Sequence, residues 1–383
     1  MMKTMQPALR NGRNIWDPIN MPREEFLERI RKVREGMKQR GIDCLLAYGN
    51  AFDECANPCY FSNYVIRLPK GFMVAIPRQG EPTLFFEGAS RGLPSARMIT
   101  WIQDVRACPD VAGKCVEYLK EKDLIPGTIG DGGLKRLMPH HQLKSLIQAL
   151  EGCTILDAED MVLDMRKIKS PREQDQVRRA SRVVKHCLDL LQDKAFSNMR
   201  ERAVEAYIIR EARMEGAEDV RLLLGRSSAT QWALGPPENA IMPNGTTMIL
   251  YLALSFERYW SSAFRTYVVK DNSFSECKMP ELDSLFRDRV AKIRPGISVS
   301  EWCKETMTEI TRHGGDFLLG FGLGSGVGLS PVEKPLMEIG SSEDFREGMC
   351  ISVRLGQKDK ALGDVMLGDT FLITQTDTRC LTV

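Results

Sequence analysis

A sharply defined helix start at residue 170 constrains the folding of this chain more than any other feature. In KSPREQDQVRRASRVVKHCLDLL, Ser170 is suited to cap a helix, Pro171 fits its first position, and Glu173 completes a capping box. Apolar residues then recur at helical spacing, and RAVEAYIIREARMEG predicts a second helix. The expected order of helices and strands differs on either side of this point, so we predict two domains, residues 1–160 and 161–383.

The first domain is predicted to be a small α/β unit. Residues 24–43 have helical spacing and end at Gly41, and CLLAYG follows as a buried strand. Residues 71–78 and 81–88 predict a hairpin, and helices flank a short strand around TIGDG. This alternation indicates a mixed sheet with helices.

The second domain is predicted to be α+β. After the paired helices come the strand-like segments DVRLLLGRSS, TTMILYLALSF and RYWSSAFRTYVV. Helices are expected over 279–293 and 300–313, and further strands in GMCISVRLG and GDTFLITQT. Helices that back an antiparallel sheet fit this order.

Composition narrows the function classes. The 53 basic and 51 acidic residues give a net charge of +2, which offers no reason to expect nucleic acid or a membrane as partner. No apolar run is long enough to span a bilayer, and the N-terminus lacks the apolar core of a signal peptide. The eleven cysteines include no C-x-x-C, so reduced thiols and a cytoplasmic location are expected. We interpret Cys55 and Cys59 as loop thiols rather than metal ligands.

Four motifs in the correct order resemble those of the creatinase/aminopeptidase P/prolidase superfamily. They are MRKIKSPREQDQVRRA, RYWSSAFRTYVV, GSGVGLSPVEKP, and the pair REGMCISVRLG and LGDTFLITQTDTRCLT. The resemblance covers nearly the whole chain. It implies a creatinase-type N-terminal α/β domain followed by a catalytic-type domain with the pita-bread fold. It also implies a homodimer in which each N-terminal domain contributes to the partner's site.

The resemblance also implies where metal ligands would lie, and none is present. Family metallopeptidases hold two divalent metals with two Asp, one His and two Glu. These positions fall at Tyr251, Ser262, Ser325, Arg354 and Gly368. Divalent metals prefer carboxylate and imidazole ligands, and a guanidinium repels a cation. We therefore predict no metal and no other cofactor.

The histidine-dependent mechanism of creatinase is not expected either. The corresponding position falls at Leu234, and no histidine occurs in that segment. His140, His141, His186 and His313 are expected on helices or at helix ends. A structural role is the simpler interpretation for each of them.

Four residues are candidates for catalysis. Tyr251 and Glu333 are proton-carrier candidates, Ser325 is a hydrogen-bond donor, and Arg354 binds an anion and lowers the pKa of Tyr251. The alternatives are a packed core tyrosine, a loop-anchoring Glu333, a Ser325 retained only for its size, and an ion pair of Arg354 with Glu333 or another local acid.

Four further residues are candidates for substrate binding: Arg67, Ser262, Arg265 and Trp232. Arginines suit bidentate binding of a carboxylate, and Lys70 is a weaker candidate beside Arg67. The alternatives are a surface charge for Arg67, an ion pair for Arg265, and core packing for Trp232 and Trp260.

These candidates predict a metal-independent, creatinase-like hydrolase or lyase that cleaves a C–N or C–C bond of a small anionic substrate. The alternative is a non-catalytic pseudo-peptidase that binds a peptide or partner. A true Xaa-Pro aminopeptidase would need a compensating ligand cluster, and only Asp364 and Asp369 are available for one.

Overall fold

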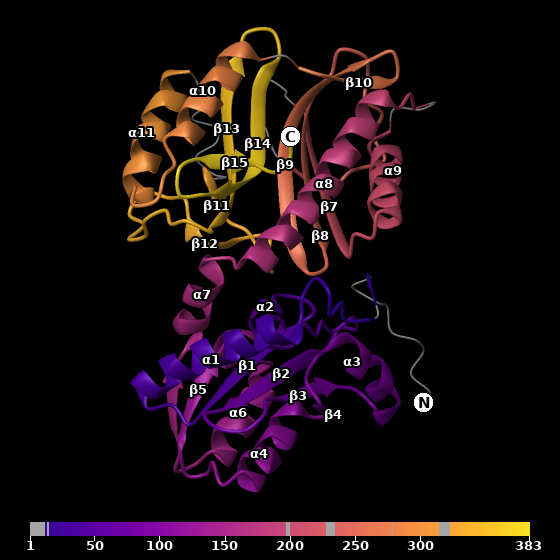
Figure 1. The fold of residues 1–383 in the computed structure, drawn as a ribbon. Helices are drawn as coiled ribbons and strands as arrows, with labels where there is room; N and C mark the ends of the chain where they lie inside the picture. Colours follow the sequence, from indigo (N-terminus) through magenta and orange to yellow (C-terminus); the bar gives the residue numbers. More distant parts are fainter. Residues whose placement is uncertain (1–11, 14, 197–199, 227–233, 278, 314–321) are drawn as a thin grey trace. The chain divides into compact units, whose positions relative to one another are not determined.

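The chain forms two compact units, Met1–Arg166 and Lys167–Val383, in a computed structural model (Figure 1). The structure describes residues 12–13, 15–196, 200–226, 234–277, 279–313 and 322–383. The division falls a few residues after the boundary predicted at residue 160. Each unit has its own sheet and its own helices.

The first unit contains a mixed sheet with the strand order β4-β3-β2-β1-β5-β6 in its described residues. Strand β2 pairs antiparallel with β1 and β3, which confirms the predicted hairpin, and β5 runs parallel to β1 and β6. The strands are β1 (Cys44–Asn50), β2 (Gly71–Pro77), β3 (Thr83–Glu87), β4 (Asp104–Cys108), β5 (Thr128–Gly132) and β6 (Thr154–Asp157).

Helices surround this sheet, and the first of them ends where the sequence predicts. Gly41 has φ 71°, and its N–H bonds the carbonyls of Met37 and Lys38. The helices are α1 (Arg23–Arg40), α2 (Ala56–Ser62), the 3₁₀ turn η1 (Ser90–Gly92), α3 (Leu93–Ile99), α4 (Val111–Glu121), α5 (Leu134–Leu137), α6 (His140–Ala149) and α7 (Glu159–Lys167).

The second unit begins with the helix start predicted at residue 170. Helix α8 (Pro171–Asp193) has a capping box in which Ser170 Oγ accepts from Glu173 N and the Glu173 carboxylate accepts from Ser170 N. Three further helices follow: α9 (Glu201–Met214), α10 (Pro280–Ala291) and α11 (Val299–Arg312).

The sheet of the second unit is antiparallel at every described pairing. Its order is β12-β11-β13-β14-β9-β8-β7, with β10 added to β9 and β15 to β14. The strands are β7 (Asp219–Arg226), β8 (Thr247–Phe256), β9 (Tyr259–Lys270), β10 (Ser273–Glu276), β11 (Gly324–Gly326), β12 (Glu333–Leu336), β13 (Cys350–Asp359), β14 (Gly363–Ile373) and β15 (Thr378–Cys380). The predicted α+β architecture is confirmed.

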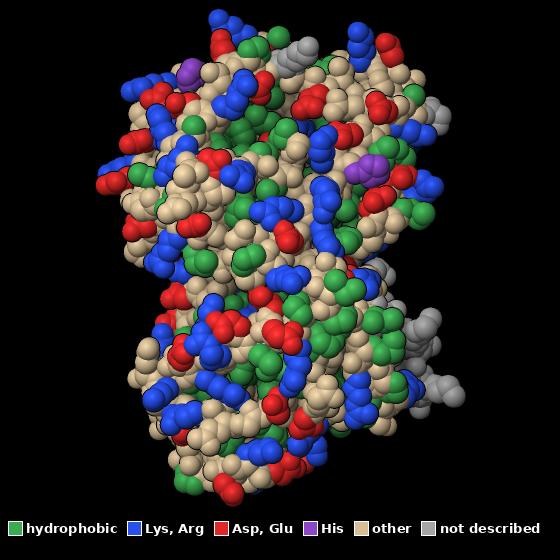
Figure 2. All heavy atoms as spheres, in the orientation of Figure 1, with side chains coloured by type: hydrophobic (Ala, Val, Ile, Leu, Met, Phe, Trp, Pro, Cys, Tyr) green, Lys and Arg blue, Asp and Glu red, His purple; other side chains and the backbone are tan. Residues whose placement is uncertain are grey.

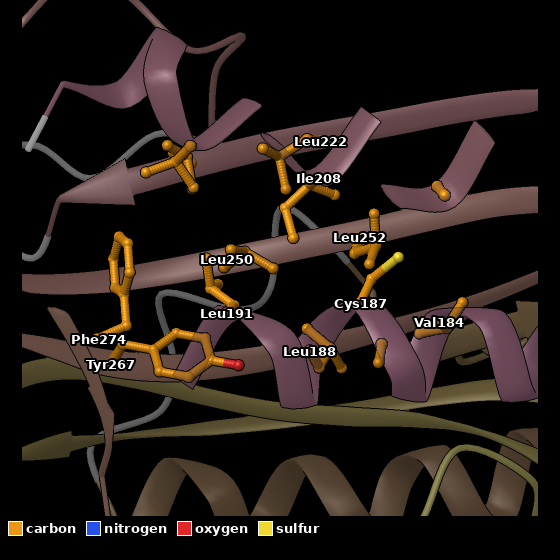
Figure 3. Packing of buried hydrophobic residues seen from close by; sticks show 14 of the residues in the cluster. Val184, Cys187, Leu188, Leu191, Ile208, Leu222, Leu250, Leu252, Tyr267 and Phe274 are labelled. Carbon is orange, nitrogen blue, oxygen red and sulfur yellow. The ribbon is translucent and has the colours of Figure 1, made fainter. Parts of the chain in front are cut away.

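A hydrophobic core fixes which face of this sheet is available for a site. Leu250 and Leu252 of β8 pack with residues of α8 and α9, including Leu188 and Ile208 (Figure 3). Successive residues of a strand point to opposite faces, so Tyr251, between the two leucines, lies on the other face. We call this other face of the sheet the site face.

Basic and acidic side chains are interspersed over the visible surface of both units (Figure 2). This distribution agrees with the small net charge of +2. Within the described ranges, no helix is long and apolar enough to cross a membrane.

Candidate functional site

Two rows of residues cross neighbouring strands on the site face. The register places Tyr251 opposite Phe264, Phe264 opposite Gly368, and Gly368 opposite Arg354. Directly opposed residues in antiparallel strands share a face. Three of the five predicted ligand positions therefore lie in one row across β8, β9, β14 and β13.

The second row contains the serine hydroxyls. Ser352 lies opposite Ser325 of β11, and its Oγ is 3.0 Å from the Oγ of Ser262. All three serines are buried, and Ser262 also hydrogen-bonds Tyr251. The structure thus brings together all five positions to which the resemblance assigned metal ligands.

Arg354 lies across the gap left by Gly368. Its guanidinium carbon is 5.8 Å from the centroid of the Phe264 ring, and its Nε donates to the carbonyl of Gly322 at 2.9 Å. A Cβ on Gly368 would lie 3.0 Å from Arg354 Cβ and 3.0 Å from Phe264 Cδ2. Glycine at position 368 therefore gives the arginine the room to lie over β9.

Burial dominates the electrostatics of this pair. It lowers the pKa of Arg354 and raises the pKa of Tyr251 above its ordinary value of 10.0. The Arg354 charge and the hydrogen bond with Ser262 act to lower the pKa of Tyr251, but the effect of burial is larger. The expectation that Arg354 would make Tyr251 a usable base is wrong, because desolvation outweighs the nearby cation. Tyr251 is a neutral hydrogen-bonding group at neutral pH.

A threonine holds the second row in place. Thr370 Oγ1 accepts from Ser262 N at 3.0 Å and donates to the Ser262 carbonyl at 2.9 Å. The same oxygen accepts from Ser261, which is 2.9 Å from Ser181 of α8. Thr370 therefore holds the backbone of Ser262 in place, and this backbone position sets the direction of the Ser262 side chain.

The donor set does not fit a divalent metal pair. A phenol, two hydroxyls, a guanidinium and a glycine replace carboxylate and imidazole ligands, and a charged guanidinium repels a cation. In the part of the chain that the structure describes, no group of three or more His, Cys, Asp or Glu side chains is arranged to hold a metal.

Glu333 is occupied by a buried ion pair, which argues against its predicted role as a proton carrier. Its Oε2 lies 2.9 Å from Lys169 Nζ, with side chains only 5% and 1% exposed, and its Oε1 accepts from Ser330 N. Gly328 lies against the pair, because a Cβ there would be 2.7 Å from Glu333 Oε2. The alternative role of a loop-anchoring acid fits these contacts.

Arg265 likewise has the contacts of a structural arginine. Its Nη2 lies 2.7 Å from Asp369 Oδ1, its Nε 3.3 Å from Glu276, and its Nη1 donates to the carbonyl of Gly368. Asp369 also accepts from Thr382 at 2.6 Å. These contacts argue against Arg265 as a substrate ligand and against Asp369 as part of a compensating metal cluster.

Arg67, Trp232 and Trp260 are the remaining residues considered for the site. Arg67 belongs to the first unit, where its Nη2 donates to the carbonyls of Gly12 and Arg13. Trp232 lies outside the described residues. Trp260 is 2% exposed on β9.

The histidines and the cysteine pair have structural positions. His140 and His141 begin α6, His186 lies on α8, and His313 caps α11. None is on the strands that carry the site. Cys55 precedes α2, in the loop as predicted, whereas Cys59 lies within the helix, so the loop prediction is wrong for Cys59.

Sequence reasoning missed three residues around the site: Lys169, Arg221 and Ser352. Arg221 lies on β7 opposite Ala253, with its guanidinium carbon 4.7 Å from the Trp260 ring. Ser352 was available as a signal, because it lies two residues before Arg354 and strand residues alternate with a period of two. Arg221 carried no such signal, because no site position was predicted on its strand. Nothing in the sequence indicated the partner of Lys169.

Family comparisons match both units. The model described as Metallopeptidase family M24 matches residues 175–375, and that described as Creatinase/Prolidase N-terminal domain matches residues 29–168. A curated relative named Xaa-Pro dipeptidase, from Pyrococcus horikoshii, is 25% identical over 255 residues, 65% of this chain and 72% of the relative.

Solved structures share the fold over nearly the whole chain. The prolidase from Pyrococcus horikoshii has a TM-score of 0.77 at 22% identity, covering 93% of this chain and 98% of that chain. The prolidase from Pyrococcus furiosus has a TM-score of 0.74 at 20% identity, covering 92% and 99%. The predicted superfamily, with its creatinase-type first domain and pita-bread second domain, is confirmed.

These findings overturn one prediction. A metal-independent, creatinase-like hydrolase or lyase that cleaves a C–N or C–C bond of a small anionic substrate was expected, but the relatives and structural neighbours are named Xaa-Pro dipeptidases and prolidases. The prediction was wrong because the absence of the metal ligands was taken to indicate a different reaction class. Their loss bears on metal binding and does not by itself exclude a peptide substrate.

Proposed function

The chain belongs to metallopeptidase family M24, an enzyme family, and we propose that it acts on short peptides at the site face without that family's metal pair. The names of the relatives support the substrate class, since they refer to Xaa-Pro dipeptides. The donor set supports the metal independence. Both parts of the proposal concern the same strands, β8, β9, β13 and β14.

The row Tyr251–Phe264–Gly368–Arg354 is the observation that carries this proposal. It puts a fixed positive charge over β9, where Gly368 makes room for it. A guanidinium binds a carboxylate with two parallel hydrogen bonds, and every peptide ends in a carboxylate unless it is blocked. Arg354 therefore supplies the anion-binding group of the site.

The hydroxyls beside Arg354 supply neutral hydrogen bonds. Tyr251 and Ser262 hydrogen-bond each other, and Ser352 lies 3.0 Å from Ser262. Because the pKa of Tyr251 is raised, its hydroxyl keeps its proton at neutral pH and donates to a peptide oxygen. These groups orient the peptide while Arg354 holds its end.

The test measures proline release from dipeptides to tetrapeptides that end in proline, with binding followed in parallel by calorimetry. The full chain is compared before and after chelator treatment, together with Arg354→Met and a control, Arg202→Met, an exposed residue of α9. We expect chelator-insensitive proline release that Arg354→Met abolishes and Arg202→Met preserves.

Other outcomes are equally informative. Proline release that depends on added Mn²⁺ would contradict metal independence. Binding without release would restrict the function to peptide recognition, and neither binding nor release would reject the proposal. An Arg354→Met chain that behaves as wild type would remove that arginine from the site.

We further propose a homodimer that works in the cytoplasm, with Arg67 contributing to the partner's site. The support is the family resemblance for the dimer and the cysteine pattern for the location. Light scattering of the purified chain should give twice the monomer mass of 43.2 kDa, and a mass of one chain would reject the dimer.

A further inference from the structure

Strand β9 presents two aromatic rings on the site face, and an arginine lies over each. Trp260, Ser262 and Phe264 alternate along that face. The guanidinium carbon of Arg221 is 4.7 Å from the Trp260 ring, and that of Arg354 is 5.8 Å from the Phe264 ring. The site face therefore carries two cations, with the Ser262 hydroxyl between them.

The two rings give the scale of the separation between the two charges, because each guanidinium lies close to its ring. Trp260 and Phe264 are four residues apart on one strand, which is about 13 Å at roughly 3.3 Å per residue. Ser262 lies midway and hydrogen-bonds Tyr251. The charges of Arg354 and Arg221 each act to lower the pKa of Tyr251, which agrees with the positions of the two arginines on either side of it.

Arg221 is held ready for a ligand. Its side chain is 50% exposed, and its Nη2 lies 3.6 Å from Asp219 Oδ2 on the same strand. Stacking on the buried Trp260 ring restricts the guanidinium before anything binds, which lowers the entropic cost of binding. An exposed, preorganised cation on the site face is suited to a second anionic group.

We infer that the site takes peptides with two carboxylates about 13 Å apart, and that Arg221 determines this specificity. The C-terminal carboxylate binds Arg354, and an acidic side chain binds Arg221. An extended peptide covers that distance in about three residues, so the acidic residue lies about three positions before the C-terminus. This inference rests on the proposed function, because it uses the same site.

The test is calorimetric titration of the full chain with acetylated Glu-Ala-Ala-Pro and with its neutral twin, acetylated Gln-Ala-Ala-Pro. Wild type, Arg221→Gln, Arg221→Lys and the exposed control Arg202→Gln are compared. We expect Arg221→Gln to weaken the Glu peptide by about tenfold or more, the effect of one lost charge-assisted contact. The Gln peptide should bind all four proteins within about twofold.

Two results would overturn the inference while leaving the proposed function intact. One is an equal effect of Arg221→Gln on both peptides. The other is an acetylated Glu-Pro that binds as tightly as the tetrapeptide, since it cannot span both arginines. If the wild-type chain binds no peptide of the series, the proposed function fails, and this inference fails with it. Arg221→Lys should retain part of the preference for Glu, because it keeps the charge but loses the planar stacking group.

Discussion

At the scale of single residues, a missing side chain at position 368 decides where a charge lies. Gly368 separates Arg354 from Phe264 in the cross-strand row, and any Cβ there would approach both at 3.0 Å. The resemblance assigns a metal-binding Glu to this position. Glycine removes that ligand and also provides the space for the Arg354 guanidinium, which itself stands at the position of the other metal-binding Glu. The replacements at 368 and 354 are therefore compatible with each other.

Replacing Gly368 by alanine should therefore crowd the row. We expect Gly368→Ala to lower the free energy of unfolding by about 1–3 kcal/mol, the usual cost of overpacking, and to weaken peptide binding. Denaturant unfolding and calorimetry measure the two effects. Gly235→Ala is the control, because a Cβ at Gly235 meets no atom within 4 Å. Equal stability of the two variants would contradict the packing argument.

Tyr251 gives a prediction about alkaline pH. Its folded pKa is raised above 10.0, so the folded chain holds this proton more tightly than the unfolded chain does. The stabilisation is complete below the unfolded pKa and is lost as pH rises from there through the folded pKa. Tyr251→Phe should therefore lose less stability than wild type above about pH 10. Unfolding free energies measured across that range provide the check, and parallel curves would contradict it.

At the scale of elements, a buried ion pair connects the start of α8 to the glycine-containing segment 324–333. Lys169 immediately precedes the Ser170 cap, and Glu333 begins β12. Glu333 also accepts from Ser330 N, while Lys169 N donates to Gly348 O. The pair therefore connects three segments, and one of them, β12, pairs with the strand that contains Ser325.

Breaking this pair should be costly. We expect Lys169→Met to lower the unfolding free energy by about 3–5 kcal/mol, because Glu333 loses its partner while still buried. Adding Glu333→Gln should recover part of the loss. The control Lys185→Met removes an exposed pair with Asp189 and should change stability by less than about 1 kcal/mol. If both lysine variants unfold alike, the buried pair is not a structural link.

At the scale of the whole molecule, two units with separate cores should respond separately to heat and to ligand. Their cores draw on different residues, the first on β1–β5 with α4 and α6, and the second on β7–β9 with α8 and α9. Scanning calorimetry of the full chain should show two transitions. A peptide bound at the site face should raise the transition of Lys167–Val383, by mass action. A single transition that shifts as a whole would contradict this independence.

The architecture could be predicted from the sequence because the local signals for helices and strands agree with the order of the family motifs. The cap at Ser170, the αL end at Gly41 and the strand segments each predict their elements, and the ordered motifs identify the family. The five positions that the resemblance assigns to metal ligands follow from the motifs residue by residue, and the structure places them on neighbouring strands.

The contacts of the site were less predictable, because partners distant in sequence decide them. Glu333 was a proton-carrier candidate, with pairing to Arg354 as one alternative, but Lys169, 164 residues away, holds it. Arg265 was expected to bind substrate, but Asp369 and Glu276 surround its guanidinium. The balance between desolvation and the Arg354 charge at Tyr251 depends on burial, which sequence spacing does not show.

The Arg354 row has a consequence for how the protein becomes ready to work. Metal-dependent enzymes acquire their positive charge after synthesis, by capturing ions whose supply varies with the surroundings. Here the charge is encoded in the gene and arrives with the polypeptide. On the proposal made above, a freshly folded chain needs no loading step, and starving the cell of manganese or iron would leave its site unchanged.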